Sequence, residues 1–449
     1  MKAVWFLACL CLAAPSVRAA EYKAASAAEV AAITGKLQSG DVVVLTDGSW
    51  KDQVIVFKGR GTVAKPITLR AQTPGKVVLT GKSSLTLDGD YLVVSGIAIK
   101  NAGIDGKDGF GIRGSHCRLT ESSVVDSTFK FDVHLYGTDN RVDHCYLAGK
   151  TSDSPTLQVE VQETPNSHRI DHNYFGPRPP LGRNGGETMR IGYSGQSMRN
   201  SRTVVERNLF DRCDGELEII SSKSCENIYR YNTFLDCAGM LTLRHGNRCR
   251  VEGNLFLGNN KKGSGGIRVI GDDHVIVGNY IDRVEIGGIW ITAGIPNSPL
   301  NGYYVARNAR IANNTVIDSH GPYLHLDAGF GTSGRTLRPE NITITNNLFF
   351  LPRDPASATL LKGTAGTGFQ WKDNVAVRSG AEDGPAPTGM RTLPWNDGIG
   401  ARGKDGVWRP AASSGLEGVG FSAAKPSAET GLLTSADIGP SWRASKEKQ

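Results

Sequence analysis

The chain has 449 residues, and its 51 lysines and arginines exceed its 44 acidic residues by only seven charges. So small an excess, with no basic tail and no basic stripe interleaved with aromatic residues, argues against a nucleic-acid-binding protein. A local basic cleft for an acidic polymer is still compatible with this composition. Beyond the N-terminal segment, no run is apolar enough to cross a bilayer, so we expect no contact with a membrane.

Residues 1–20 have the pattern of a secretory signal peptide. A basic start at Lys2 precedes an apolar run over residues 3–14, and small residues follow at positions 17, 19 and 20. We predict that this segment is removed, which takes away Lys2 and Arg18 and lowers the net charge from +7 to +5. Cys9 faintly resembles a lipoprotein cleavage site but comes too early, so a lipid anchor is the weaker alternative. The mature protein, residues 21–449, should be secreted or periplasmic.

Residues 25–37, ASAAEVAAITGKL, predict a short helix in front of the apolar strand DVVVL at 41–45. Further along, one short phrase recurs. Its copies are RVDHCYL (141–147), RIDHNYF (169–175), VVERNLF (204–210), IYRYNTF (228–234), CRVEGNLF (249–256), VIVGNYI (275–281), RIANNTV (310–316), ITITNNLF (342–349) and WKDNVAV (371–377). All but the first, which has Cys145 there, carry an asparagine at one position: Asn173, Asn208, Asn232, Asn254, Asn279, Asn314, Asn347 and Asn374.

This repeat predicts an all-β fold, a single-domain right-handed parallel β-helix. Steps of 22 to 25 residues leave room for three short strands and three turns but not for a helix. Asparagine tolerates a left-handed backbone, and its amide can bond the equivalent residue one coil away. A leucine-rich horseshoe or a sandwich of strands leaves the asparagine unexplained. The helix at 25–37 would then cover the open end of the solenoid.

Three further regions follow from this alignment. Long steps imply loops, such as 147–168 and 282–308, that wall a binding groove. From about residue 380 to 449 the chain is rich in Gly, Pro, Ala and Ser, and we expect it to pack along the outside of the same domain. Of six cysteines in the mature chain, Cys213 and Cys237 fall on adjacent coils, where either a disulfide or two buried thiols is compatible with the spacing.

The stretch GELEIISSK (215–223) concentrates negative charge. Read as a regular strand, it sends Leu217 and Ile219 to one face and Glu216, Glu218 and Ile220 to the other. Two carboxylates then stand side by side. The sequence alone does not say what neutralises them.

Neighbouring coils add charges of both signs to the same face. The strands GGETMRIGYS (185–194), GMLTLRHGN (239–247) and GGIRVIGDD (265–273) flank the acidic one. The side chains expected to point outward are Thr188, Arg190, Glu216, Glu218, Thr242, Arg244 and Arg268. Such a face can be only a solvated surface with ordinary ion pairs. The convergence of so many charged groups favours a site.

The ordered set NGGETMRIGYS, GELEIISSKS and LTLRHGN resembles polysaccharide lyase family six, the group of chondroitinase B and the alginate lyases. The opening of the chain, residues 40–81, resembles the start of the same family, and the likeness runs from about residue 25 to at least 270. The resemblance implies a lyase that cleaves an acidic uronate polymer by β-elimination.

Residue roles follow from the resemblance, position by position. It implies a calcium ion held by Asn184, Glu216 and Glu218, with Lys223 as general base and Arg244 as general acid. His245, Arg268 and Arg190 are expected to bind substrate.

The chemistry is consistent with this assignment. Calcium takes oxygen ligands and can cancel the charge of a uronate carboxylate, and Arg244, Arg268 and the metal would lower the pKa of Lys223. Because arginine holds its proton firmly, Arg244 could instead stabilise charge while water or His245 delivers the proton.

Other interpretations of the site stay open at this stage. A glycoside hydrolase would need paired acids, for which Asp272, Asp273 and Asp327 are the candidates, but they lack a partner set on the neighbouring strand. A non-catalytic glycan-binding solenoid is the alternative from another class. Among substrates we favour alginate over dermatan sulfate. The sequence predicts neither block preference, endo or exo action, nor oligomeric state.

Overall fold

The computed structural model describes residues 19–351, 358–378, 386–416, 418–421 and 432–444. The predicted signal segment falls almost wholly outside these ranges and stays a prediction. Among the described residues, no helix is both long and apolar enough to span a bilayer.

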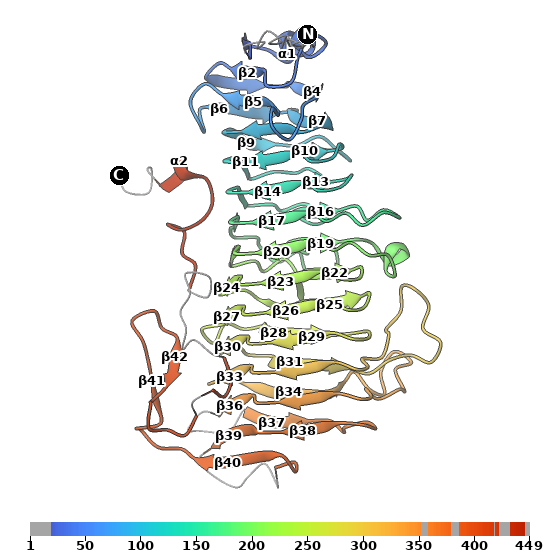
Figure 1. Cartoon of the computed structure of the whole chain (residues 1–449), viewed down its shortest axis with the longest axis vertical. Coiled ribbons are helices and arrows are strands. Elements are labelled where there is room, and N and C mark those ends of the chain that lie inside the picture. The colour runs from blue at the N-terminus through green and yellow to red at the C-terminus, as the bar shows by residue number, and fades with distance from the viewer. Residues whose placement is uncertain (1–18, 352–357, 379–385, 417, 422–431, 445–449) are drawn as a thin grey trace, which may run out of the picture.

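The chain winds through three long parallel sheets, which it visits in turn on every coil (Figure 1). Sheet A consists of β1 (Glu21–Ala24), β2 (Val42–Leu45), β5 (Ile67–Ala71), β8 (Leu92–Ser95), β11 (Arg118–Thr120), β14 (Arg141–Asp143), β17 (Arg169–Asp171), β20 (Val204–Glu206), β23 (Ile228–Arg230), β26 (Arg250–Glu252), β29 (Val275–Val277), β32 (Arg310–Ala312), β35 (Thr343–Thr345) and β38 (Gln370–Lys372). Sheet B consists of β3 (Gly48–Lys51), β6 (Val77–Gly81), β9 (Ile97–Ala102), β12 (Ser123–Val125), β15 (Tyr146–Ala148), β18 (Tyr174–Phe175), β21 (Leu209–Asp211), β24 (Thr233–Leu235), β27 (Leu255–Leu257), β30 (Tyr280–Asp282), β33 (Thr315–Ile317), β36 (Leu348–Phe350), β39 (Asn374–Arg378) and β40 (Met390–Pro394). Sheet C consists of β4 (Val54–Arg60), β7 (Ser84–Asp90), β10 (Asp108–Ile112), β13 (Phe131–Leu135), β16 (Leu157–Val159), β19 (Met189–Ile191), β22 (Glu218–Lys223), β25 (Gly239–His245), β28 (Ser264–Val269), β31 (Gly287–Thr292), β34 (Gly321–Ala328) and β37 (Ala358–Lys362). The predicted parallel β-helix is confirmed.

The repeated asparagine forms a buried ladder at the turn from sheet A to sheet B. The backbone N–H of Asn173 donates to Oδ1 of Asn208 at 2.9 Å, and the same bond repeats on each coil up to Asn374. The left-handed residue, however, is the one before each asparagine, for example His172 with φ of 55°. This turn directs the asparagine inward, where its amide has to bond its neighbours because water is excluded.

Apolar residues fill the space between the sheets. Phe175, Phe210, Phe234 and Phe256 stack on successive coils with ring centroids 4.5 to 4.7 Å apart. This spacing is the distance between paired strands, so in-register coils bring identical side chains into contact. The six cysteines of the described chain are buried free thiols. Cys213 and Cys237 are adjacent as expected, but the Cys213 N–H donates to Sγ of Cys237 at 3.3 Å and no disulfide joins them.

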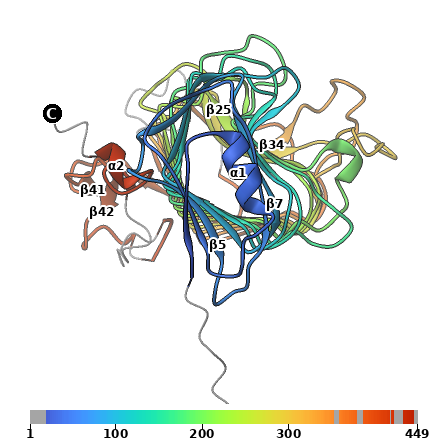
Figure 2. The ribbon, with the colours of Figure 1, turned by 90° about the horizontal axis from the view of Figure 1, so that it is seen from above.

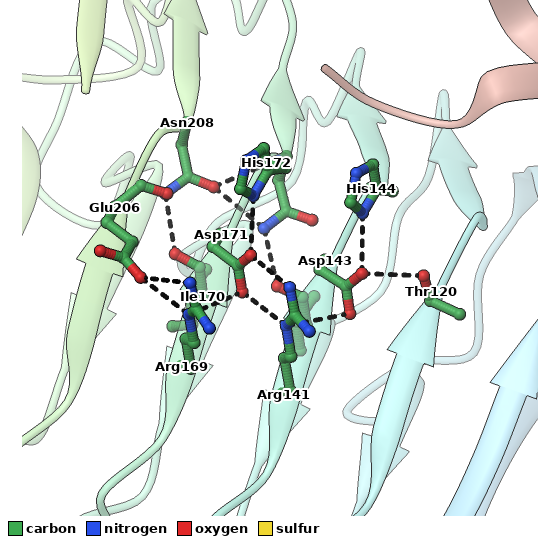
Figure 3. A network of polar contacts seen from close by, with 12 residues as sticks. Thr120, Arg141, Asp143, His144, Arg169, Ile170, Asp171, His172, Glu206 and Asn208 are labelled. Atoms are coloured by element: carbon green, nitrogen blue, oxygen red, sulfur yellow. Dashed lines mark hydrogen bonds and ion pairs between the residues drawn. The ribbon is translucent and has the colours of Figure 1, made fainter. Parts of the chain in front are cut away.

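The outer face of sheet A carries a ladder of ion pairs (Figure 3). Aligned carboxylates of Asp143, Asp171 and Glu206 each accept hydrogen bonds from an arginine of the preceding strand. Arg141, for instance, donates to both oxygens of Asp171, at 2.6 and 2.8 Å. Burial alone would raise the pKa of Asp171, but hydrogen bonds from His172 and Arg141 lower it.

Helix α1 (Ala27–Thr34) lies across the N-terminal end of the solenoid, as predicted (Figure 2). Ser26 caps it, because its hydroxyl oxygen accepts from the N–H of Glu29 at 3.2 Å. Val30 is fully buried against the first coils. The helix thereby covers apolar surface that the first coil would otherwise expose.

The C-terminal residues run back along sheet B (Figure 1). After β40 come the antiparallel pair β41 (Gly400–Arg402) and β42 (Trp408–Pro410), then the short helix α2 (Ser441–Ala444). Arg402 donates to Asp282 and Asp318, both at 2.6 Å. Ile438 packs against Tyr174 and Leu209 on earlier coils. Sheet B is therefore partly covered, and sheet C is the face on which the candidate site lies.

Candidate functional site

The acidic strand β22 does not alternate regularly, so the predicted facing of its side chains is wrong in part. A bulge between Glu218 and Ile220 places both Ile219 and Ile220 in the core, and Leu217, predicted to share a face with Ile219, is 41% exposed. Glu216 precedes the strand. The extra residue of a bulge changes which side chains face outward. Here it leaves Glu218 outside, hydrogen-bonded by the hydroxyl of Ser221.

Two glycines bring a third acid to this pair. Gly186 and Gly215 touch backbone to backbone, and a Cβ on Gly186 would lie 2.3 Å from the carbonyl oxygen of Gly215. Only glycine permits so close an approach. The residues that follow these glycines, Glu187 and Glu216, are consequently held side by side. The buried Arg178 fixes the same segment by donating to the backbone carbonyls of Glu187 and Ser154.

Glu187, Glu216 and Glu218 form one carboxylate cluster, with an oxygen of each within 4.8 Å of the others. Both oxygens of Glu187 and one of Glu216 are buried without a hydrogen-bond partner. Burial, reinforced by the charges of Glu187 and Glu218, raises the pKa of Glu216 to about 8. Buried carboxylates are normally paired or bound to a metal, so this cluster is suited to a cation.

Asn184 and Thr188 lie on either side of Glu187 in the sequence but differ in environment. Asn184 is exposed, next to Gly185, whose backbone hydrogen-bonds Glu216. Thr188, predicted to point outward from a strand, instead lies before β19 and is buried, with its hydroxyl unpartnered. The turn that carries Glu187 inward buries Thr188 with it.

Lys223 ends β22 beside the carboxylate cluster. Its side chain is 15% exposed, and its Nζ lies 4.0 Å from Oε1 of Glu187. Burial is the main cause that lowers the pKa of Lys223, and the positive charges of Arg190 and Arg244 lower it further. The negative charges of Glu218 and Glu187 raise the pKa and partly offset this shift. The predicted direction of the shift is correct, although burial rather than neighbouring arginines dominates.

Arg244 and His245 end the next strand, β25. Arg244 Nε lies 3.7 Å from Oε1 of Glu218, and Nη1 is 2.7 Å from the carbonyl oxygen of Gly302 and 2.6 Å from Nε2 of His245. Burial lowers the pKa of Arg244. Burial, with the charges of Arg244 and Lys223, lowers the pKa of His245 to about 3, so the imidazole is neutral near pH 7. A neutral imidazole is a poor proton donor, which weakens the alternative that His245 delivers the proton.

A loop over residues 293–309 reaches back to these arginines. The guanidinium of Arg244 lies 4.2 Å from the ring centroid of Tyr303, and those of Arg335 and Arg268 lie at 4.5 and 5.6 Å. Contacts of this kind orient cations over an aromatic face. The loop projects from the same side of the solenoid as the short helix η1 (Ser194–Gln196) (Figure 1). The predicted loop ranges 147–168 and 282–308 are too wide, since they include β16 and β31.

Arg190 and Arg268 lie in one outward row that crosses sheet C. Strand pairing aligns Gln158, Arg190, Ser221, Thr242 and Arg268 on consecutive coils. Arg190 contacts Glu187 at 3.5 Å and Arg268 contacts Glu218 at 3.7 Å, so the two arginines flank the carboxylates. Thr242 belongs to the row as predicted but is fully buried, and its hydroxyl has no hydrogen-bond partner.

Glu187 and Tyr303 are the site residues that the sequence did not single out. Glu187 is the last residue of NGGE, so the motif contained the signal, but regular alternation gave no reason to join it to Glu216. Tyr303 lies in a loop about 60 residues beyond Arg244, and no local pattern connects the two.

The three acids considered for a hydrolase do not form a pair with one another. Asp273 accepts from Asn308 at 3.1 Å in the turn after β28, whereas Asp327 is near the end of β34 and contacts Arg338 at 3.3 Å. Asp272, beside Asp273, forms a backbone bridge with Arg307. Paired acids across a sugar bond are required for glycoside hydrolysis, and these residues do not supply them.

Comparison with known proteins agrees with this fold. A family model described as chondroitinase B matches residues 24–386. The structure of the PL6 family alginate lyase AlyGC is similar with a TM-score of 0.84 and 36% identity over 94% of this chain, which spans 58% of that protein. A mannuronic acid specific family 6 lyase from human gut microbiota matches with a TM-score of 0.79 and 33% identity, over 95% of this chain and 98% of that protein.

A PL6 family polysaccharide lyase from Pseudopedobacter saltans matches with a TM-score of 0.77 and 26% identity, over 94% of this chain and 99% of the other. No curated protein sequence matches this chain. The length of the family match and the identities above 30% leave no ambiguity about ancestry. The chain belongs to the chondroitinase B family, polysaccharide lyase family six.

Proposed function

We propose that the protein is a calcium-assisted lyase that cleaves an acidic uronate polymer, alginate in preference, by β-elimination. The observation that carries this proposal is the cluster of Glu187, Glu216 and Glu218 with unpartnered buried oxygens, beside the half-buried Lys223 and Arg244. A cluster of like charges is costly unless a cation or a proton neutralises it.

The donor set suits calcium, which prefers several oxygen ligands, including carboxylates and amide carbonyls. Glu187, Glu216 and Glu218 would hold the ion, and Asn184 is the proposed amide ligand from the adjoining loop. When bound, the ion would supply positive charge that neutralises the uronate carboxylate and acidifies the neighbouring C–H bond. Glu187 extends the ligand set expected from the sequence.

Lys223 would act as the general base. Burial lowers its pKa, so a neutral amine is accessible nearer to neutral pH than for an exposed lysine. Nζ would accept the proton from the ring carbon that bears the carboxylate. The electron pair of that C–H bond then forms the double bond to the next ring carbon, as the bond from that carbon to the glycosidic oxygen breaks.

Arg244 would serve the departing oxygen, which needs a proton or a compensating charge. Its guanidinium is held by Glu218, the Gly302 carbonyl oxygen and Tyr303, so its position is fixed without substrate. Preorganised donors at a developing negative charge are an effective source of catalysis. Arg190, His245 and Arg268 would orient the sugar acids on either side of the scissile bond.

Alginate is the proposed substrate because AlyGC is described as an alginate lyase and the gut enzyme as mannuronic acid specific. The N-terminal signal pattern supports export, as an extracellular polymer requires.

The test is to incubate the purified protein with alginate and with dermatan sulfate, with added calcium and with a chelator, while recording ultraviolet absorbance. A lyase product carries a conjugated double bond that absorbs. We expect an absorbance increase with alginate that the chelator suppresses. New reducing ends without absorbance would indicate a hydrolase, and neither signal on any uronate polymer would contradict the proposal.

A further inference from the structure

A hollow lies on sheet C nearer the N-terminus, away from the carboxylate cluster. It has a volume of about 400 Å³ and is formed over β4, β7, β10 and β13. That volume is within the range of pockets that bind small ligands. Its lining includes Lys107, Arg113, Lys130, His134 and Tyr136. The residues assigned to the reaction all lie on later coils.

The hollow carries an excess of positive charge. Its one carboxylate, Asp108, is already engaged by His134 at 3.2 Å and by Arg113 at 3.6 Å. Lys107 and Lys130 are exposed, and neither forms an ion pair with any described residue. Apolar surface lies beside these cations: Val54 is 56% exposed, and the Tyr136 ring stacks under Arg113 at 4.5 Å. The Nζ of Lys130 lies 5.3 Å from the ring centroid of Phe131. Cations that lack an ion-pair partner and lie beside apolar surface suit a sugar acid.

A continuous row of polar side chains connects the hollow with the carboxylate cluster. Strand pairing aligns His134 with Gln158, Gln158 with Arg190, and Arg190 with Ser221. Arg190 donates to Gln158 at 2.8 Å, so the row is ordered. From β19, beside Glu187, to β13, beside Lys130, there are two strand steps, or roughly 10 Å, and from β22 to β10 there are four, or roughly 19 Å, at the usual strand spacing. Several consecutive sugars of a chain lying along the solenoid axis would span that distance.

We propose that this hollow is a distal binding position for a carboxylate of the same polyuronate chain, with Lys107 and Lys130 as its cations. The inference rests on the proposed function and adds a preference for the length of the substrate chain. A long polymer can occupy the carboxylate cluster and the whole hollow at once, whereas a trisaccharide bound at the cluster covers at most the nearer part of the hollow, beside Lys130. The protein therefore favours long chains over short ones.

The experiment compares the double variant Lys107→Ala/Lys130→Ala with a matched control, Lys51→Ala/Lys100→Ala, which removes two exposed lysines from sheet B. For long polymer we expect kcat/KM to fall about three- to tenfold in the first variant, the size of two partly exposed ion pairs. For a uronate trisaccharide, which covers less of the hollow, we expect a smaller fall. The loss on polymer should shrink at high salt, because exposed charges are screened.

Binding is measured separately in the Lys223→Ala background, where polymer is not turned over. There, Lys107→Ala/Lys130→Ala should raise the Kd for long polyuronate by the same factor and raise the Kd for trisaccharide by less. Equal losses on both lengths, an equal loss in the Lys51→Ala/Lys100→Ala control, or no loss on polymer would overturn the distal position. If the unaltered protein cleaves no uronate polymer, the proposed function fails instead, and the two failures are distinct.

Discussion

Sheet A and sheet C use the same residue types in opposite ways. On sheet A each carboxylate of the ladder in Figure 3 accepts short hydrogen bonds from arginine, as Asp171 does from Arg141 at 2.6 and 2.8 Å. On sheet C the cations stay 3.5 to 4.0 Å from Glu187 and Glu218, and buried carboxylate oxygens lack partners.

The pKa values differ accordingly between the two sheets. Although burial opposes it, hydrogen bonding lowers the pKa of Asp171, whereas burial and neighbouring acids raise the pKa of Glu216 to about 8. A carboxylate that is fully hydrogen-bonded by arginine stabilises the fold, but its oxygens are not available to bind a ligand. An unsatisfied cluster costs stability and is available for chemistry.

The largest expected effect is the loss of catalysis when Lys223, on sheet C, is replaced. Lys223→Ala should lower turnover of alginate by about 10²- to 10⁴-fold, since a positioned base is removed. Its thermal unfolding should change little, because the one ion pair that Lys223 makes with a described residue, to Glu187, spans 4.0 Å. The measurement is the ultraviolet rate beside a melting curve. Near-normal turnover in a folded variant would remove Lys223 from the mechanism.

The second test separates metal binding from folding. Glu187→Gln should weaken calcium binding by at least about tenfold, because it removes a charged ligand. Without calcium the variant should melt at or above the temperature of the unaltered protein, since an unpartnered buried carboxylate is gone. Calorimetry and calcium-dependent melting check both parts. A large loss of stability in chelator would mean that Glu187 is structural.

The matched change on sheet A is Asp171→Asn, which should lower stability and leave the catalytic site intact. We expect a loss of about 1 to 3 kcal/mol in the free energy of unfolding, because a buried, arginine-bound carboxylate is neutralised. Lyase activity and calcium affinity should be kept. Denaturant unfolding measures the stability and the ultraviolet assay measures the activity. If Asp171→Asn lost activity but kept full stability, the proposed difference between sheet A and sheet C would be wrong.

The smallest expected effect is in the pH dependence of stability. Because the folded state lowers the pKa of Asp171, its contribution is present above its ordinary pKa of about 3.9 and is lost as pH falls through the lower, folded value. The gap in unfolding free energy between the unaltered protein and Asp171→Asn should therefore narrow below about pH 4. A gap that stays constant into acid would show that Asp171 acts through packing instead.

The asparagine repeat was enough to predict the solenoid, because stacking in register brings each copy against the next and the same local bonds recur on every coil. The helix over the N-terminal end was predicted for a related reason, since an open coil has apolar surface to cover. Glu216, Glu218 and Arg244 were placed on one face by the strand order, whereas Lys223 was assigned from the family resemblance, which also supplied the roles of all four.

Tertiary structure decided the details of the site. The bulge in β22 and the contact of Gly186 with Gly215 join Glu187 to the cluster, and neither follows from regular alternation. Tyr303 reaches Arg244 through a loop whose path depends on distant contacts. The sequence by itself determined the repeating architecture because it rests on local, periodic interactions. Which carboxylates remain unpaired depends on contacts between segments remote in the chain, and only the folded structure determines those.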